Sequence, residues 1–244
     1  MKLHVINPNT SVTMSEKIAH AARNASTSAE IVMLTNSDGA ASLESHFEEA
    51  LAVPGMLSLV DQISRAEESS GIVIACFGDP GVAAARELAD VPVVGIAEAA
   101  MRTAAALARR FSVVTTLART LPMAKAILAH TGLNHSCARL RACEVEVSRL
   151  EQMEPAVYQQ LLEECQRAVA EDDIDALVLG CAGMADLNQR LSHELGIPVI
   201  DGVAAAIQQL EGLAALGLKP AKRADRASPP PKPLSGPYAY LARH

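Results

Sequence analysis

Short apolar runs alternate along the chain with longer segments whose apolar residues recur at helical spacing. The runs at residues 72–75 and 176–180 are rich in Val, Ile and Leu and are bounded by turn residues. Continuous apolar runs of this length are typical of strands that are buried on both faces of a parallel sheet. The pattern therefore predicts an α/β protein in which helices make right-handed connections between parallel strands.

The same pattern of apolar and polar residues predicts where each strand and helix begins and ends. Asp79 and Pro80 form a helix-start signal, because an Asp side chain accepts the first free N–H groups and Pro suits the first helical position. Pro54 and Gly55 favour an interruption of the second helix. We expect strands at residues 3–6, 30–35, 72–75, 93–96, 111–116, 140–147, 176–180 and 199–200. We expect helices at residues 12–23, 44–67, 83–89, 98–109, 121–130, 154–171 and 203–216.

The composition changes beyond Gly217. Residues 219–233 contain Lys, Arg and a run of Pro, which excludes a helix or a central strand and predicts an extended tail. Apolar residues follow this run, and we expect them to dock either on the parent subunit or on a neighbouring one. They are Leu234, Tyr238, Tyr240 and Leu241.

One unit of sequence occurs twice. A buried-strand run ends at Cys76 in the first copy and at Cys181 in the second, and each cysteine precedes a Gly-containing turn, a helical segment and a short strand. Cys76 precedes Pro92 by 16 residues and Cys181 precedes Pro198 by 17, so the copies match with one insertion. The repeat predicts two similar halves, each with one equivalent cysteine.

Polar and thiol side chains gather where the predicted strands end. In open α/β sheets, ligands bind beyond the carboxyl ends of the strands. If the two halves face each other across a pseudo-twofold axis, Cys76 and Cys181 meet at opposite sides of one cleft. Asn7, Thr115 and Thr116 also fall at strand ends and are candidate substrate contacts.

Two thiols on opposite sides of a substrate suit proton transfer at a carbon next to a carbonyl. One thiolate removes the proton, and the opposite thiol supplies a proton to the other face. A helix N-terminus lowers the pKa of a Cys, so we expect a useful thiolate fraction at neutral pH without metal or cofactor. Backbone N–H groups would stabilise the negative charge on the carbonyl oxygen, and they come from the segments Phe77-Gly78 and Ala182-Gly183. These residues predict a cofactor-independent racemase.

Each candidate also has a purely structural interpretation. Cys76 and Cys181 could be equivalent packing positions inherited by duplication, because a Cys after a buried strand often serves as a small apolar residue. Asp79 and Asp201 are interpreted as a helix cap and a turn residue, and His46 as a surface or capping residue. The remaining cysteines are assigned to packing or structure: Cys137, Cys143 and Cys165.

Composition narrows the classes of partner. The 244 residues carry a formal net charge of −7 and include three Phe, three Tyr and no Trp, which argues against a nucleic-acid partner. The N-terminal stretch lacks the pattern of a signal peptide, and no apolar stretch reaches the roughly 18 residues of a membrane span. Five widely spaced cysteines without a CxxC pair give no disulfide or metal framework. We therefore expect a cytoplasmic protein with a small-molecule substrate and with no nucleic-acid, membrane or metal partner.

Seven stretches carry a resemblance to a known family. They are INPNT from Ile6, SLESHFEEA from Ser42, ACFGDPG from Ala75, VVGIAEAAM from Val93, RFSVVTTL from Arg110, VLGCAGMADL from Val178 and PVIDGVAAA from Pro198. At these stretches the chain resembles the aspartate/glutamate/hydantoin racemase superfamily, and within it the hydantoin and allantoin racemases. The resemblance implies two α/β domains about a pseudo-twofold axis, with the active site between them and the two repeated cysteines as its bases. It also implies a discontinuous first domain, residues 1–97 plus 205–244, and a second domain of residues 98–204.

One departure from the family pattern bears on the substrate. Amino-acid racemases of the superfamily typically have a hydroxyl residue shortly after each cysteine, which holds the substrate carboxylate, and this chain has none there. The resemblance then favours a neutral ring held by backbone groups, namely a 5-substituted hydantoin, with allantoin a strong candidate. Phe77, Met184 and the segment around His46 are expected to line the pocket for the ring substituent.

Two alternatives to this function remain open from the sequence. An aspartate or glutamate racemase is the alternative enzyme, and activity on a free amino acid would favour it. A small-molecule binding protein with two α/β lobes is the alternative from another class. We expect a homo-oligomer, on the basis of the resemblance and of the apolar residues in the tail.

Overall fold

Parallel strands form two four-stranded sheets in the computed structural model, which describes residues 1–66 and 68–242. The first sheet contains β1 (Lys2–Asn7), β2 (Glu30–Thr35), β3 (Gly71–Ile74) and β4 (Val93–Gly95). The second contains β5 (Phe111–Thr115), β6 (Cys137–Ala142), β7 (Ala176–Gly180) and β8 (Val199–Ile200). Their orders are β2-β1-β3-β4 and β6-β5-β7-β8, so the second half repeats the topology of the first. The predicted α/β fold with two similar halves is confirmed.

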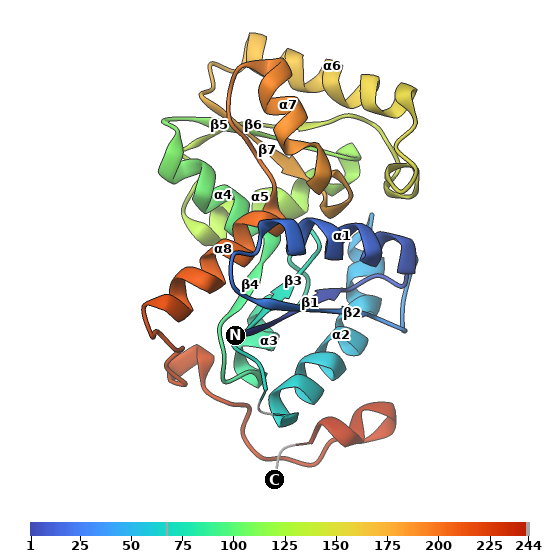
Figure 1. Ribbon diagram of the computed structural model, residues 1–244. Coiled ribbons are helices and arrows are strands. Elements are labelled where there is room, and N and C mark those ends of the chain that lie inside the picture. The colour runs from blue at the N-terminus through green and yellow to red at the C-terminus, as the bar shows by residue number, and fades with distance from the viewer. Residues whose placement is uncertain (67, 243–244) are drawn as a thin grey trace.

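Helices connect the strands and fill the space between the two sheets. Figure 1 shows the sheets one above the other, with α1, α4 and α8 between them. None of the helices in the described part of the chain is long and apolar enough to cross a membrane. The helices are α1 (Val12–Ala25), α2 (His46–Ala66), α3 (Val82–Leu88), α4 (Ile96–Leu107), α5 (Leu121–Thr131), α6 (Pro155–Glu171), α7 (Asn188–Leu195) and α8 (Gly202–Ala215).

One apolar core joins the two halves. It includes Val73 from the first sheet and Val178 from the second, both fully buried. Met101 from α4 and Ile207 from α8 lie between them in the same cluster and are fully buried as well. Because burial of a large apolar side chain contributes roughly 1.5–3 kcal/mol, this shared cluster holds the halves in a fixed arrangement.

The chain passes from one half to the other at the beginnings of α4 and α8. A Cβ added to Gly202 would lie 2.6 Å from the backbone oxygen of Ile96, so the two helix starts cross in close contact. Beyond that crossing, α4 packs against β7 of the second sheet and α8 packs against α1 and β3 of the first half. The proposed domain bounds at residues 97 and 204 stay a prediction, because they depend on how these two crossing helices are assigned.

Asp79 caps a different helix from the one that the sequence predicts. The turn after Cys76 delays α3 until Val82, and Gly81 precedes that helix with a positive φ of 67°. Asp79 instead accepts the N–H groups of Ala97 (3.0 Å) and Glu98 (2.8 Å) at the start of α4. The Asp79 side chain supplies this cap because Gly95, which precedes α4, has no side chain.

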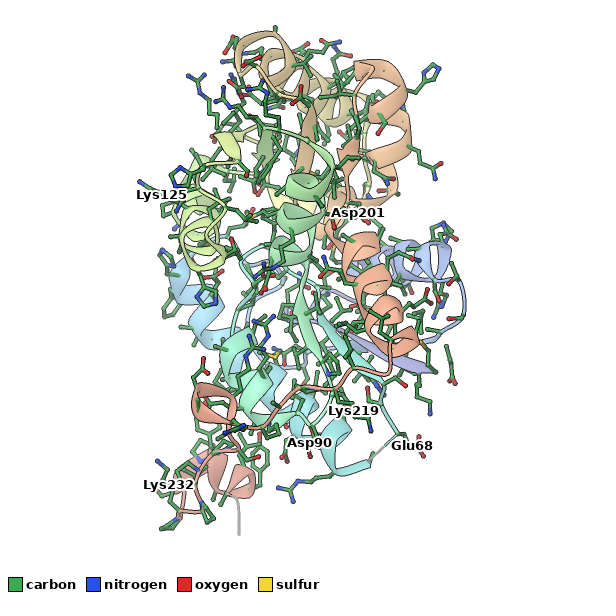
Figure 2. The ribbon with its side chains drawn as sticks, turned by 90° about the vertical axis from the view of Figure 1, so that its left-hand side faces the viewer. Glu68, Asp90, Lys125, Asp201, Lys219 and Lys232 are labelled. Atoms are coloured by element: carbon green, nitrogen blue, oxygen red, sulfur yellow. The ribbon has the colours of Figure 1, made fainter. Side chains whose placement is uncertain are left out.

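In the second half, the equivalent helix α8 is capped by the residue that directly precedes it. Asp201 accepts the N–H groups of Val203 (3.0 Å) and Ala204 (2.8 Å) at the start of α8. It lies where the upper part of the molecule meets α8 (Figure 2). The interpretation of Asp201 as a local structural residue therefore agrees with its contacts, and it is a helix cap.

Two other element predictions differ from the structure. Pro54 does not interrupt α2, which continues through it. In the same stretch of α2, the backbone oxygen of Ala52 accepts a hydrogen bond from Nδ2 of Asn36 (3.0 Å). The strand expected at residues 140–147 begins earlier and ends at Ala142. Glu144 has a φ of 54°, and this left-handed conformation is incompatible with a continuing strand.

The C-terminal tail lies along the first half of its own chain. Lys222 donates from Nζ to the backbone oxygens of Arg86 (3.1 Å), Glu87 (2.6 Å) and Ala89 (3.0 Å), which belong to the end of α3. Figure 2 shows the tail crossing the lower part of the molecule between the labelled Lys219 and Lys232. Within one chain the tail therefore wraps its parent, whereas the homo-oligomer stays a prediction. Three apolar residues of the tail are exposed: Leu234, Tyr238 and Tyr240.

Candidate active site

The two repeated cysteines line one cavity between the halves. Cys76 lies just beyond β3 and Cys181 directly follows β7, so the carboxyl ends of two equivalent strands meet there. The cavity has a volume of about 50 Å³. All the residues proposed from the sequence belong to its lining except Asn7 and Met184. The proposed residues in the lining are Cys76, Phe77, Gly78, Thr115, Thr116, Cys181, Ala182 and Gly183.

The backbone folds alike around the two cysteines. The backbone oxygen of Cys76 accepts the N–H of Asp79 (3.0 Å), and that of Cys181 accepts the N–H of Met184 (3.1 Å). In each turn the N–H of a glycine also donates toward the thiol, from Gly78 in the first half and from Gly183 in the second. The repeated sequence therefore produces a repeated turn, with one thiol and one set of N–H donors in each half.

Burial dominates the chemistry of both thiols. It raises the pKa of Cys181 to about 11 and raises the pKa of Cys76 further still. Each glycine N–H opposes the rise in pKa without cancelling it. The expectation of a useful thiolate fraction at neutral pH is wrong, because water exclusion raises the pKa of each thiol by more than the nearby N–H groups lower it.

The surroundings of the two thiols differ in charge. The Glu49 carboxylate adds to the rise in the pKa of Cys76, whereas the Lys17 ammonium partly counteracts the rise in the pKa of Cys181. These charges therefore favour a thiolate at Cys181 over one at Cys76.

Asn7 and Met184 lie in the interior instead of in the cavity lining. Asn7 is fully buried and donates from Nδ2 to Asn9 Oδ1 (2.7 Å) and Ser15 Oγ (3.0 Å), so its amide holds the turn after β1. Met184 is fully buried in the apolar cluster of the second half. The side chain from the Asn-Pro-Asn turn that lines the cavity is Asn9, two residues further along.

Several lining residues were missed by the sequence interpretation. Most are apolar and come from elements other than the cysteine turns, so no local motif marks them. Glu49, on α2, is the only carboxylate among these missed lining residues. It belongs to the segment around His46, which is expected from the sequence to line the pocket for the ring substituent. The missed residues are Asn9, Met14, Leu43, Glu49, Ala75, Thr120, Met123, Ala124, Val147 and Gly180.

A larger hollow of about 310 Å³ adjoins the cavity. The two share Glu49, Gly78 and Met123 in their linings, and His46 and His130 line only the outer one. Small-molecule pockets typically enclose roughly 300–1,000 Å³, so the inner cavity alone is small for a substrate. The arrangement suits a reacting group between the thiols and a substituent that extends into the outer hollow.

Lys17, in the first half, is hydrogen-bonded to the turn that contains Cys181. Its ammonium group, on α1, donates to the backbone oxygens of Leu150 (2.8 Å) and Gly183 (2.9 Å) and lies 3.3 Å from Asp186 Oδ1. The Lys17 side chain is 17% exposed, so these bonds are largely shielded from water. Lys17 is therefore a positioning residue that acts on the site through the backbone beside Cys181.

We expect Lys17→Met to lower the free energy of unfolding by about 1.5–3 kcal/mol, because hydrogen bonds from a charged donor contribute about this much. The pH profile of kcat/KM should also shift to higher pH, since the nearby positive charge is lost from Cys181. Thermal unfolding and initial rates between pH 6 and 9 would check both effects. Lys125→Met is the control, because Lys125 projects outward from α5 (Figure 2). A Lys17→Met variant with the stability and the pH profile of Lys125→Met would contradict both the positioning role and the effect of the Lys17 charge on Cys181.

The two halves, each supplying a thiol to one cavity, have counterparts among known proteins. A family model described as Asp/Glu/Hydantoin racemase matches residues 3–210. The protein is therefore an isomerase of the racemase class. It belongs to the Asp/Glu/hydantoin racemase family.

Similar proteins match along the whole chain. The hydantoin racemase of Pseudomonas sp. (strain NS671) is 41% identical over 247 residues, which cover 100% of this chain and 98% of that protein. The structure of the allantoin racemase from Klebsiella pneumoniae is 47% identical, with 100% of both chains covered and a TM-score of 0.96. The allantoin racemase AllR from Pseudomonas fluorescens is 38% identical and covers 97% of this chain and 100% of its own, with a TM-score of 0.92.

Proposed function

We propose that this protein racemises 5-substituted hydantoins, allantoin among them, with Cys76 and Cys181 as the two bases. The observation that carries the proposal is the meeting of two equivalent thiols, one from each half, at a single cavity. The names of the similar proteins supply the substrate class, since they include hydantoin racemases and allantoin racemases. No metal or cofactor takes part in the proposed reaction.

The proposed reaction moves one proton at the C5 carbon of the ring. A thiolate on one face takes the C5 proton, and the electron pair of the broken C–H bond moves into the neighbouring carbonyl, whose oxygen becomes negative. Backbone N–H groups of the cysteine turns stabilise that oxygen. The opposite thiol then donates its proton to the other face of C5, which leaves the product as the opposite enantiomer and the thiolate on the other side.

The charges around the cavity support a neutral substrate. Among the described residues, those that line the cavity include no Lys, Arg or His side chain, and Glu49 contributes a carboxylate. A free amino acid would bring its own carboxylate into this site without a cation to pair with it, at a high desolvation cost. A hydantoin ring avoids that cost, and this argument favours it over aspartate or glutamate.

The first test is the loss of optical rotation from pure enantiomers of allantoin, of a 5-alkylhydantoin and of glutamate. We expect the purified protein, with a thiol reductant and a chelator present, to abolish the rotation of at least one hydantoin and to leave glutamate unchanged. Decay with glutamate alone would replace this proposal with an amino-acid racemase. No decay above the rate without protein for any of the three would reject the proposed function.

A further inference from the structure

One oxygen of Glu49 is buried without a partner. Within the described residues Oε1 has no hydrogen-bond partner, while Oε2 lies 3.5 Å from Nδ1 of His46. Burial raises the pKa of this carboxyl, as expected for a charge that has lost its water. An acceptor that is buried and unpaired costs free energy, so its retention at a cavity wall calls for an explanation.

Gly78 fixes where that oxygen lies. A Cβ added to Gly78 would meet Glu49 Oε1 at 1.8 Å, so the carboxylate rests directly on the backbone of the Cys76 turn. Any side chain at position 78 would displace it. The unpaired oxygen is thus held against Gly78, two residues along the chain from Cys76, and all three residues line the inner cavity.

Glu49 also stands at the junction of the two hollows. It lines the inner cavity together with both thiols and lines the outer hollow together with His46 and His130. A ring that reacts between the thiols must direct its C5 substituent past this junction to reach the larger space. The first polar groups of that substituent therefore come next to the Glu49 carboxylate.

We propose that Glu49 is a specificity-determining residue that accepts the N–H groups of a ureido substituent, so that allantoin is preferred over hydantoins with apolar substituents. The inference rests on the proposed function and names the preferred substrate within it. A ureido group carries N–H donors that match a carboxylate oxygen in need of a partner. An alkyl group leaves that oxygen unpaired.

The expected preference for allantoin follows from this difference between a substituent that pairs with Glu49 and one that does not. A site that is built to hydrogen-bond a substrate group discriminates strongly against an analogue that lacks it, because the protein group is then left buried and unpaired. Glu49 belongs to the substituent site and itself neither gives nor takes the proton, and the effect of its charge on the pKa of Cys76 is common to both substrates. Its replacement should therefore change the ratio of two substrates far more than it changes the rate with an apolar one.

The test compares kcat/KM for allantoin and for 5-isobutylhydantoin in the unmodified protein, Glu49→Gln and Glu49→Leu. We expect the unmodified protein to prefer allantoin. In Glu49→Leu, kcat/KM should fall about 100-fold with allantoin and stay the same or rise with 5-isobutylhydantoin. In Glu49→Gln, kcat/KM with allantoin should fall about 10-fold. The intermediate loss is expected because an amide keeps one acceptor oxygen. Glu163→Gln, on the exposed face of α6, is the control.

The outcomes separate this inference from the function on which it rests. Equal losses with both substrates in Glu49→Leu would show a general structural role and overturn the inference. An unmodified protein that racemises 5-isobutylhydantoin faster than allantoin would also overturn it, while the proposed function stands. Inactivity of the unmodified protein with both substrates would reject the proposed function itself.

Discussion

Cys76→Ser and Cys181→Ser should each lower racemisation of both hydantoin enantiomers by about 10²- to 10⁴-fold, the usual contribution of one acid or base. The loss should be equal in the two directions, because every turnover needs a base on one face and an acid on the other. A hydroxyl group can replace neither, since its pKa lies far above that of a thiol. Initial rates of optical rotation from each pure enantiomer, corrected for the rate without protein, measure the effect.

Isotope exchange should distinguish the two variants. Each keeps one thiol, which can still remove the C5 proton of the enantiomer that faces it and return a deuteron from solvent to the same face. In deuterium oxide, one variant should label one enantiomer and the other variant the opposite one, as followed by loss of the C5 proton signal in NMR. Labelling of the same enantiomer by both variants would contradict the opposite placement of the thiols.

Cys137→Ser is the matched control for these variants. Cys137 is half-buried at the start of β6 and does not line the cavity, so its loss should leave the rate unchanged. If Cys76→Ser and Cys181→Ser racemise as fast as Cys137→Ser, the two-base mechanism is wrong. The repeated cysteines would then be packing positions inherited by duplication, which is the structural interpretation of the same repeat.

The repeat made the fold and the core of the site predictable from the sequence. A buried run, a cysteine and a glycine turn form a local unit, and two copies imply two sheets of the same topology with their strand ends together. The residues next to the cysteines were found for that reason. Asn7 and Met184 show the limit of this reasoning, because a displacement of two or three residues along a turn moves a side chain from the cavity to the core.

Contacts between distant segments were beyond the reach of the sequence. Asp79 caps α4, nearly twenty residues away, and Glu49 reaches the Cys76 turn from α2. Lys17 reaches the Cys181 turn from the other half of the molecule. No spacing in the sequence signals these contacts, because they arise only when the helices pack. The pKa of Cys76 shows the same limit. The N–H donors that lower it belong to a local turn and could be predicted, whereas the burial that raises it arises only when the two halves assemble.

A second large effect is expected in a buried charge network of the second half. Arg141, on β6, donates to both oxygens of Asp172 (2.7 and 2.6 Å), and it also donates to Glu164 (3.1 Å) and Glu171 (2.7 Å). The side chains of Arg141 and Asp172 are 4% and 2% exposed. Arg141→Met should lower the free energy of unfolding at pH 7 by about 3–5 kcal/mol, because it leaves the buried Asp172 carboxylate without its buried partner and the two hydrogen bonds from it.

The pH dependence of this loss provides a sharper test than its size. Burial acts to raise the pKa of Asp172, but hydrogen bonds from Arg141 and Ser112 outweigh it and hold that pKa below its usual range. The carboxylate therefore stabilises the unmodified protein above the unfolded-state pKa of about 3.9, and this contribution is lost as the pH falls through the lowered folded-state pKa. In Arg141→Met burial prevails, the folded-state pKa rises, and stability falls as the pH rises from about 4.

Urea unfolding at pH 7 and at pH 4.5 should therefore show a smaller difference between Arg141→Met and the unmodified protein at the lower pH. Arg139→Met is the matched control on the same strand: Arg139 lies 3.6 Å from the same Asp172, but its side chain is 58% exposed. Its loss should cost less than about 1 kcal/mol, as is usual for exposed ion pairs. Equal losses for the two variants would contradict the assigned strength of this network, because only Arg141 is buried and hydrogen-bonded to the shared carboxylate.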